Sequence, residues 1–204
     1  MKKIIMISTL AVVLALTGIW AAQKNTKHVA QSEEVQKELE VNFREGDTKV
    51  SVAHAKVESF RSLQELEDHS DLIVRGVKLD GKENVTTSPI GTIMDVETIS
   101  RFQVSAVYKG VVAQGDVLTV AEPVATHRGV IVSIAGYKAM KQGKEYILFL
   151  FKAPDTNNLG IVAVTQGKYT TDRTVELYAK QEEDNHKRIS KYTKEVNDKY
   201  SKEQ

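Results

Sequence analysis

Residue types that commonly carry catalysis or bind metals are scattered along this chain of 204 residues. None of its five histidines stands at the spacing that places two metal ligands on one face of a helix or strand. They are His28, His54, His69, His127 and His186. The chain also contains no cysteine, which excludes thiol catalysis, iron–sulfur clusters and disulfide bonds. The sequence therefore predicts neither a metal site nor a bound cofactor.

Two stretches contain a serine of the kind that a hydrolase uses as its nucleophile. Ser133 lies between two glycines but inside an apolar run, where a serine is ordinarily a strand residue. Asp71 directly follows His69 and Ser70, between a predicted helix and a predicted strand, which favours capping or turn formation. The chain has no nucleophile elbow, phosphate-binding glycine loop or dinucleotide-binding signature. These patterns favour a non-enzymatic protein, and leave open a hydrolase whose acidic and histidine side chains meet only after folding.

The balance of charges argues against a nucleic-acid partner. The chain has 28 Lys and Arg against 27 Asp and Glu, so its formal net charge is +1. Binding to phosphates requires clustered positive charge. A hydrophobic fraction of 41% and a charged fraction of 27% are typical of a globular protein. We expect one modest folded domain with extensions.

The amino-terminal residues 1–22 predict a signal peptide or a membrane anchor. Lys2 and Lys3 precede the apolar run Ile4–Leu16, and Trp20 lies near its end. The apolar stretch of about 19 residues is at the lower limit of what crosses a bilayer. The two lysines favour a cytoplasmic amino terminus, so the rest of the chain is expected outside the cytoplasm.

The sizes of the residues near the end of this stretch indicate whether it is cleaved or retained as a membrane span. Cleavage after Ala21 or Ala22 places a bulky residue at the third position upstream, whereas Trp20 suits the interface of a retained span. We favour a cleaved signal narrowly over a single uncleaved span, which would attach the protein to the membrane. The stretch Leu16–Gly18 begins like a lipoprotein box, but Ile19 occupies the position of the lipidated cysteine, so the protein is not a lipoprotein.

Composition divides the rest of the chain into three segments. Residues 23–61 form a polar stalk, in which Thr48–Val57 alternates partially and predicts an edge strand. Residues 62–173 predict the folded domain, and the charged, glycine-free residues 174–204 predict an amphipathic helix. Its apolar stripe consists of Tyr178, Ile189, Tyr192, Val196 and Tyr200. The helix is either a lid packed on the domain, which we favour, or a surface helix that binds a partner.

The central segment contains a short helix and several strands. Ser62 and Glu65 have the spacing of a capping box, which predicts a helix to about His69. Residues Asp80–Gly91, which include Pro89, predict a long loop. Apolar or alternating runs predict strands at Leu72–Leu79, Val96–Tyr108, Val117–Val120, Gly129–Ala135, Glu145–Phe151 and Leu159–Thr165. The pattern predicts a mainly β fold, a small antiparallel OB-like barrel, with a β-sandwich as the alternative.

Four stretches carry a resemblance to known proteins. Ser70–Gly76, Phe102–Gly110, Gly115–Val120 and Gly143–Leu150 resemble, in this order, a group of exported proteins of unknown function from Gram-positive bacteria. In strand order they are also similar to the module of netrins and tissue inhibitors of metalloproteinases, which is an OB-type barrel. The similarity covers about Ser62–Tyr169 and consists mostly of core and turn residues. It therefore implies a fold more than an activity.

The resemblance does not extend to the inhibitory chemistry of that family. A free amino-terminal cysteine of those inhibitors chelates the metal of the protease, and this chain contains no cysteine. Inhibition by that mechanism is therefore not implied.

Fold analogy supplies the candidate binding residues. OB barrels present their second and third strands to extended ligands. By this analogy Arg101, Gln103 and Thr119 face a ligand, although solvated strand residues have the same pattern. The predicted function is an exported, non-enzymatic binding domain for a peptide, a protein or a cell-envelope component. An extracytoplasmic hydrolase and a structural envelope spacer remain the alternatives.

Overall fold

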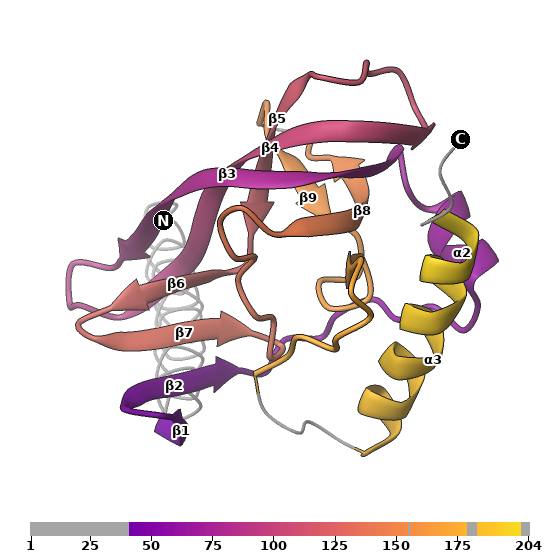
Figure 1. Cartoon of the computed structure of the whole chain (residues 1–204). Coiled ribbons are helices and arrows are strands. Elements are labelled where there is room, and N and C mark those ends of the chain that lie inside the picture. Colours follow the sequence, from indigo (N-terminus) through magenta and orange to yellow (C-terminus); the bar gives the residue numbers. More distant parts are fainter. Residues whose placement is uncertain (1–40, 155, 179–182, 201–204) are drawn as a thin grey trace, which may run out of the picture. The chain divides into compact units, whose positions relative to one another are not determined.

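The computed structural model of the protein describes residues 41–154, 156–178 and 183–200 (Figure 1). The predicted targeting residues Lys2, Lys3 and Trp20 lie outside the described residues. In the described part of the chain, no helix combines the length and apolar character needed to cross a membrane. In chain order, the elements are β1 (Val41–Glu45), β2 (Thr48–Ala53), α2 (Leu63–Asp68), β3 (Leu72–Thr87), β4 (Ile93–Lys109), β5 (Val117–Glu122), β6 (Val124–His127), β7 (Val130–Ile134), β8 (Glu145–Lys152), β9 (Leu159–Ile161), β10 (Lys168–Thr170) and α3 (Glu183–Tyr200).

Most of these strands form a sheet that closes on itself. The order of the larger sheet is β10-β8-β3-β4-β5-β9, and β9 also pairs with β8. The pairing of β9 is parallel with β5 and antiparallel with β8, so β3, β4, β5, β9 and β8 complete a ring. Closure leaves few unpaired strand edges. The fold class predicted from the sequence, a mainly β OB-like barrel with a short helix before it and a charged helix after it, is confirmed.

The strand β8 shows how the sequence builds two layers of core. Alternate side chains of a strand point to opposite faces. Tyr146, Leu148 and Leu150 belong to the cluster inside the barrel, whereas Ile147 and Phe149 belong to a second cluster beneath the helices. All five side chains are fully buried. The prediction of a strand buried on both faces is correct.

The predicted loop at residues 80–91 is wrong in its extent. The strand β3 continues to Thr87, and its outer half pairs with β4 from Asp80 opposite Arg101 to Thr87 opposite Ile93. The chain reverses only around Ser88, whose carbonyl accepts from the N–H of Gly91 over 2.9 Å. Nearly all side chains from position 80 to position 87 are exposed, so no apolar alternation marks this half of the hairpin.

A smaller sheet of order β1-β2-β7-β6 lies beside the barrel (Figure 1). The predicted edge strand at residues 48–57 is present as β2, but it lies between β1 and β7 and pairs with β7 in parallel. The strand β6 has no counterpart in the sequence prediction. Ser133 is a buried strand residue, as predicted, and its hydroxyl donates to the carbonyl of Tyr137 over 2.7 Å.

The two helices pack together on one side of the barrel (Figure 1). Ser62 caps α2, because its hydroxyl accepts from the N–H of Glu65 over 3.1 Å. The helix α3 starts at Glu183, not at residue 174 as predicted. Tyr178 precedes it, and its N–H donates to the carbonyl of Gly136 over 2.7 Å, which keeps this stretch extended along the barrel.

The apolar stripe of α3 faces the barrel. Ile189, Tyr192, Val196 and Tyr200 are buried. The ring of Tyr200 packs edge-on to Phe149 of β8 at 5.8 Å between centroids. The described part of α3 therefore packs as the lid interpretation predicts.

Candidate functional site

The three binding residues predicted by analogy lie on the outer surface of β4 and β5. Arg101, Gln103 and Thr119 are exposed, and Arg101 stands opposite Thr119 in the strand register. The guanidinium of Arg101 is held by Asp80 through hydrogen bonds of 2.6 and 2.9 Å, and this contact lowers the pKa of Asp80. Arg101 therefore already has a carboxylate partner. None of the three residues lines the two grooves described next.

A groove with a volume of about 440 Å³ lies where the start of β4, the end of β5 and the β8–β9 connection meet. We call it the apolar groove. Its walls are mainly apolar, from Val57, Val96, Pro123, Phe151, Ile161 and Val164. Its acidic residues are Glu58, Asp95 and Glu97, apart from Glu122, whose carboxylate is buried. In OB barrels the second and third strands and the loop between the fourth and fifth bind ligands, and β4, β5 and the β8–β9 connection hold those positions here.

The side chain of Phe151 forms one wall of this groove because its cross-strand partner is a glycine. Phe151 on β8 stands opposite Gly160 on β9. A Cβ atom at Gly160 would lie 2.3 Å from Cζ of Phe151. The ring therefore lies across the glycine and remains 38% exposed. An aromatic ring over a cross-strand glycine is a known way of filling the space that the glycine leaves.

Another part of the groove's wall has an unusual backbone. Ala163 and Val164 have φ values of 49° and 53°, in the left-handed region. A β-branched residue rarely adopts this conformation, and such strain persists only where surrounding contacts enforce it. Here the turn is tied to the segment before α2, because the side-chain amide of Gln166 accepts from the N–H of Phe60 over 2.8 Å and donates to its carbonyl over 3.3 Å. This wall is therefore fixed in place.

The charges facing the apolar groove are of one sign. Among the described residues, the carboxylates of Glu58 and Asp95 have no hydrogen-bond or ion-pair partner. Glu97 accepts only from the neutral amide of Asn84, over 3.1 Å. Within the described part of the chain, no lysine, arginine or histidine lines this groove. The groove thus combines an apolar floor with acidic residues at its rim that no cation among the described lining residues neutralises.

A second, smaller groove of about 290 Å³ adjoins the first and shares Val57, Glu58 and Ala163 with it. It is more polar, and its lining includes His54 and Arg188. Nη1 of Arg188 donates to the hydroxyl of Ser59 over 2.5 Å. The smaller groove therefore contains one cation, Arg188, beside the shared Glu58, whereas no cation among the described residues lines the apolar groove.

A buried carboxylate lies inside the barrel. Glu122 is fully buried, and its two oxygens accept four hydrogen bonds, from Lys78 Nζ at 2.8 Å, Ser100 Oγ at 2.5 Å, the Tyr137 hydroxyl at 2.9 Å and the N–H of Met140 at 2.6 Å. Burial and the charge of Glu122 raise the pKa of Tyr137, which keeps this donor protonated. With four donors in place, Glu122 has no position left for a substrate or a water nucleophile.

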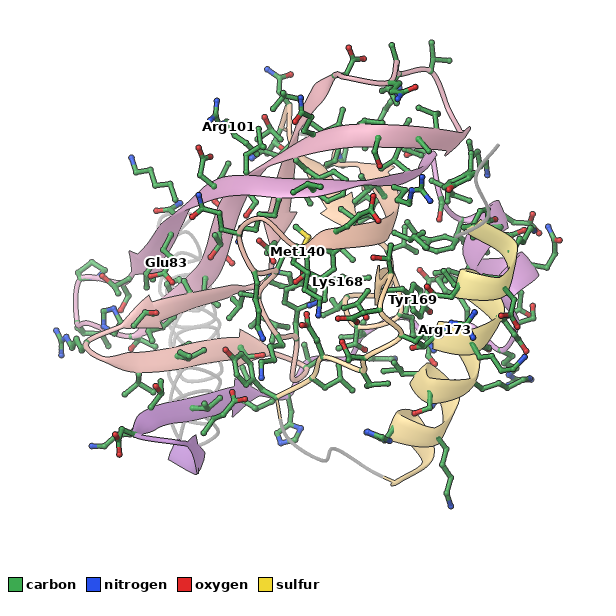
Figure 2. All side chains as sticks on the ribbon, viewed as in Figure 1. Glu83, Arg101, Met140, Lys168, Tyr169 and Arg173 are labelled. Carbon is green, nitrogen blue, oxygen red and sulfur yellow. The ribbon has the colours of Figure 1, made fainter. Side chains whose placement is uncertain are left out.

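A second buried charge, Lys168 of β10, lies near this carboxylate. Lys168 points into the barrel, whereas its neighbour Tyr169 points toward α3 (Figure 2). Its Nζ donates to the carbonyl of Lys138 and lies 4.5 Å from the ring centroid of Tyr137 and 3.7 Å from a carboxylate oxygen of Glu176. Burial lowers the pKa of Lys168 to about 8. Both buried charges belong to the interior scaffold.

The stretch from His69 to Asp71 forms no catalytic dyad. Ser70 Oγ donates to the carbonyl of Leu66 over 2.6 Å, and Asp71 accepts from the N–H of Lys152 over 2.7 Å. The imidazole of His69 contacts the carbonyl of Glu65 at 2.8 Å. These three residues cap and turn the chain, as their position predicts. In the described ranges, no three His, Asp or Glu side chains group as metal ligands.

Sequence reasoning missed the residues of the apolar groove. Glu58 lay in the predicted stalk, and Phe151 at the end of a strand predicted to be buried. Val164 carries no sequence signal for a positive φ. No model of a known protein family matches the chain, and a search of curated proteins finds no match either.

Proposed function

We propose that this protein is an exported, non-enzymatic binding domain, and that its apolar groove takes an extended segment of a peptide or protein. The observation that supports the proposal most is the position of the groove beside β4, β5 and the β8–β9 connection. This is the part of OB-type barrels that serves extended ligands. Export rests on the predicted leader alone.

The chemistry of the groove favours a polypeptide over other ligands. Its acidic residues oppose phosphate-rich polymers, including nucleic acids and anionic envelope polymers. Stacking of sugars or bases requires aromatic platforms, and Phe151 is the one aromatic residue among the described residues that line it. A peptide supplies apolar side chains for the floor and backbone groups for the rim.

The alternatives have less support. Glu122 gives a hydrolase no support, because its four donors saturate the carboxylate. Glu58 and Asp95 are free, but among the described residues no histidine, lysine or arginine lines the groove to act with them. A passive envelope spacer needs no groove with unpaired charges. Binding is therefore the function we propose.

Retention of the purified full chain on an array of immobilised decapeptides tests this proposal. Phe151→Ala removes a wall of the groove and is expected to abolish most of the retention. Val111→Ala is the matched control, because Val111 is an exposed apolar residue, 98% accessible, that does not line the groove. Equal retention by the two variants, or no retention of the native protein by any peptide, would contradict the proposal.

The proposed location is tested separately. Cells are fractionated, and mass spectrometry identifies the first residue of the mature chain. Recovery outside the cytoplasm is expected, and an intact Met1 in the membrane fraction would indicate an uncleaved anchor. Recovery only in the cytoplasm would contradict export.

A further inference from the structure

We infer that the apolar groove selects a cationic peptide segment, in which an apolar side chain is flanked by lysine or arginine. The inference rests on the proposed function and specifies its ligand. It is carried by the combination of an apolar floor with Glu58, Asp95 and Glu97 at the rim, and with no cation among the described residues that line the groove. Unpaired carboxylates of one sign attract a partner of opposite charge and repel acidic ones.

The state of the three carboxylates sharpens this argument. Glu58 and Asp95 are exposed and have no partner among the described residues. Some other exposed acids of the fold are paired with a cation, such as Asp80 with Arg101 at 2.6 Å and Asp198 with Lys194 at 2.7 Å. Acidic side chains near the apolar groove are therefore left unneutralised where a ligand would lie.

The dimensions of basic side chains suit this surface. Lysine and arginine have long apolar stems that lie along apolar walls while the charged group stays in water. A peptide residue seated between Phe151 and Val164 would bury its apolar side chain. The stems of its basic neighbours would reach over the walls to the carboxylates of Asp95 and Glu58. An acidic neighbour would meet only like charge.

Arg188 limits where such a segment lies. Its guanidinium belongs to the smaller groove beyond Glu58, and it has no carboxylate partner among the described residues. It would repel a cationic ligand that extended past Glu58. The basic residues are therefore placed in the apolar groove and not in the smaller one.

The test compares three fluorescein-labelled decapeptides, in which leucine alternates with lysine, glutamine or glutamate. Fluorescence anisotropy of each peptide with the full chain is measured at low and at high salt. The lysine peptide is expected to bind most tightly and the glutamate peptide least. High salt should weaken only the lysine peptide, because salt screens exposed charges.

Matched variants locate the effect. Glu58→Gln and Asp95→Asn each remove one rim charge and should weaken the lysine peptide by about two- to fivefold, as expected for exposed ion pairs. The double variant should weaken it by roughly tenfold, and the glutamine peptide should respond to none of them. Asp47→Asn is the control, because Asp47 is an exposed acid that does not line the groove.

The outcomes separate the two proposals. Equal affinity for the lysine and glutamine peptides, with a loss of both in Phe151→Ala, would overturn the cationic preference and leave a binding groove. A lysine preference that Glu58→Gln and Asp95→Asn do not reduce would also overturn it, because the charges would then act elsewhere. Failure of all three peptides to bind the folded protein would overturn the proposed function as well.

Discussion

Lys78 and Glu122 form an ion pair across the interior of the barrel, with 2.8 Å between Lys78 Nζ and Glu122 Oε1. They come from β3 and β5, which are separated in the sheet by β4. The carboxylate of Glu122 is fully buried, and the lysine side chain is nearly so. A buried pair of this kind contributes little net stability, but loss of one partner leaves an uncompensated charge in the core.

The variant Lys78→Met should therefore be strongly destabilising. It leaves Glu122 buried without its cation, and we expect the free energy of unfolding to fall by about 3–5 kcal/mol. Urea denaturation followed by circular dichroism measures the change. Arg101→Met breaks the exposed pair with Asp80 and is the control, with a much smaller effect expected. Similar losses in the two variants would refute the structural role of the buried pair.

The buried ammonium of Lys168 should make stability rise with pH in the alkaline range. Burial lowers its pKa from 10.5 to about 8. Below that pH Lys168 is protonated in both the folded and the unfolded protein, and burying its charge reduces the free energy of unfolding. Between the two values the folded state loses the proton first, so the unfolded state binds more protons and the free energy of unfolding increases.

Urea unfolding of the native protein and of Lys168→Met between about pH 7.5 and 9.5 checks this sign. Over this range the free energy of unfolding of the native protein should rise with pH relative to that of the variant. A fall with rising pH would contradict the lowered pKa of Lys168. The range stays low enough that exposed tyrosines of the unfolded chain remain protonated. Lys49→Met removes an exposed lysine and should keep the native dependence.

The sequence predicts those parts of the fold in which local pattern and burial agree. The strand at residues 145–152 is apolar at every buried position, and its length excludes a membrane span. In β4, the even positions from Val96 to Val104 are buried, and the alternation ends there, because residues 105–108 are all half-buried. The small helix is predicted by its cap, because Ser62 and Glu65 are neighbours along the chain.

The remaining features depend on contacts between residues distant in sequence. Lys78 and Glu122 are 44 positions apart. Each shares a strand face with buried residues, but a charged side chain alone does not predict a partner inside the core. The apolar groove joins residues 57 to 164, which meet only when β9 closes the barrel. Exposed polar strands such as the outer half of β3 have no periodicity, so pairing with β4 alone decides their structure.

The contact between α3 and the barrel predicts a specific stability effect. Val196 is fully buried against the outer cluster of the barrel, beside Tyr169 and Phe149. Val196→Ala removes methyl groups and leaves a cavity, so we expect a loss of about 1–3 kcal/mol in urea denaturation. Lys191→Ala on the exposed side of the same helix is the control and should change stability much less. An unchanged midpoint for Val196→Ala would mean that α3 does not pack on the barrel in solution.

The glycine opposite Phe151 predicts a coupling between the two positions. In Gly160→Ala the new methyl group would lie 2.3 Å from Cζ of Phe151, so the ring must leave its place over β9. We expect a loss of about 1–3 kcal/mol in the free energy of unfolding and weaker binding of peptides in the apolar groove. In the Phe151→Leu background the same substitution meets no ring atoms and should cost less. A double-mutant cycle from urea denaturation should give a coupling of about 0.5–3 kcal/mol, whereas strictly additive effects would show that the ring does not lie over the glycine.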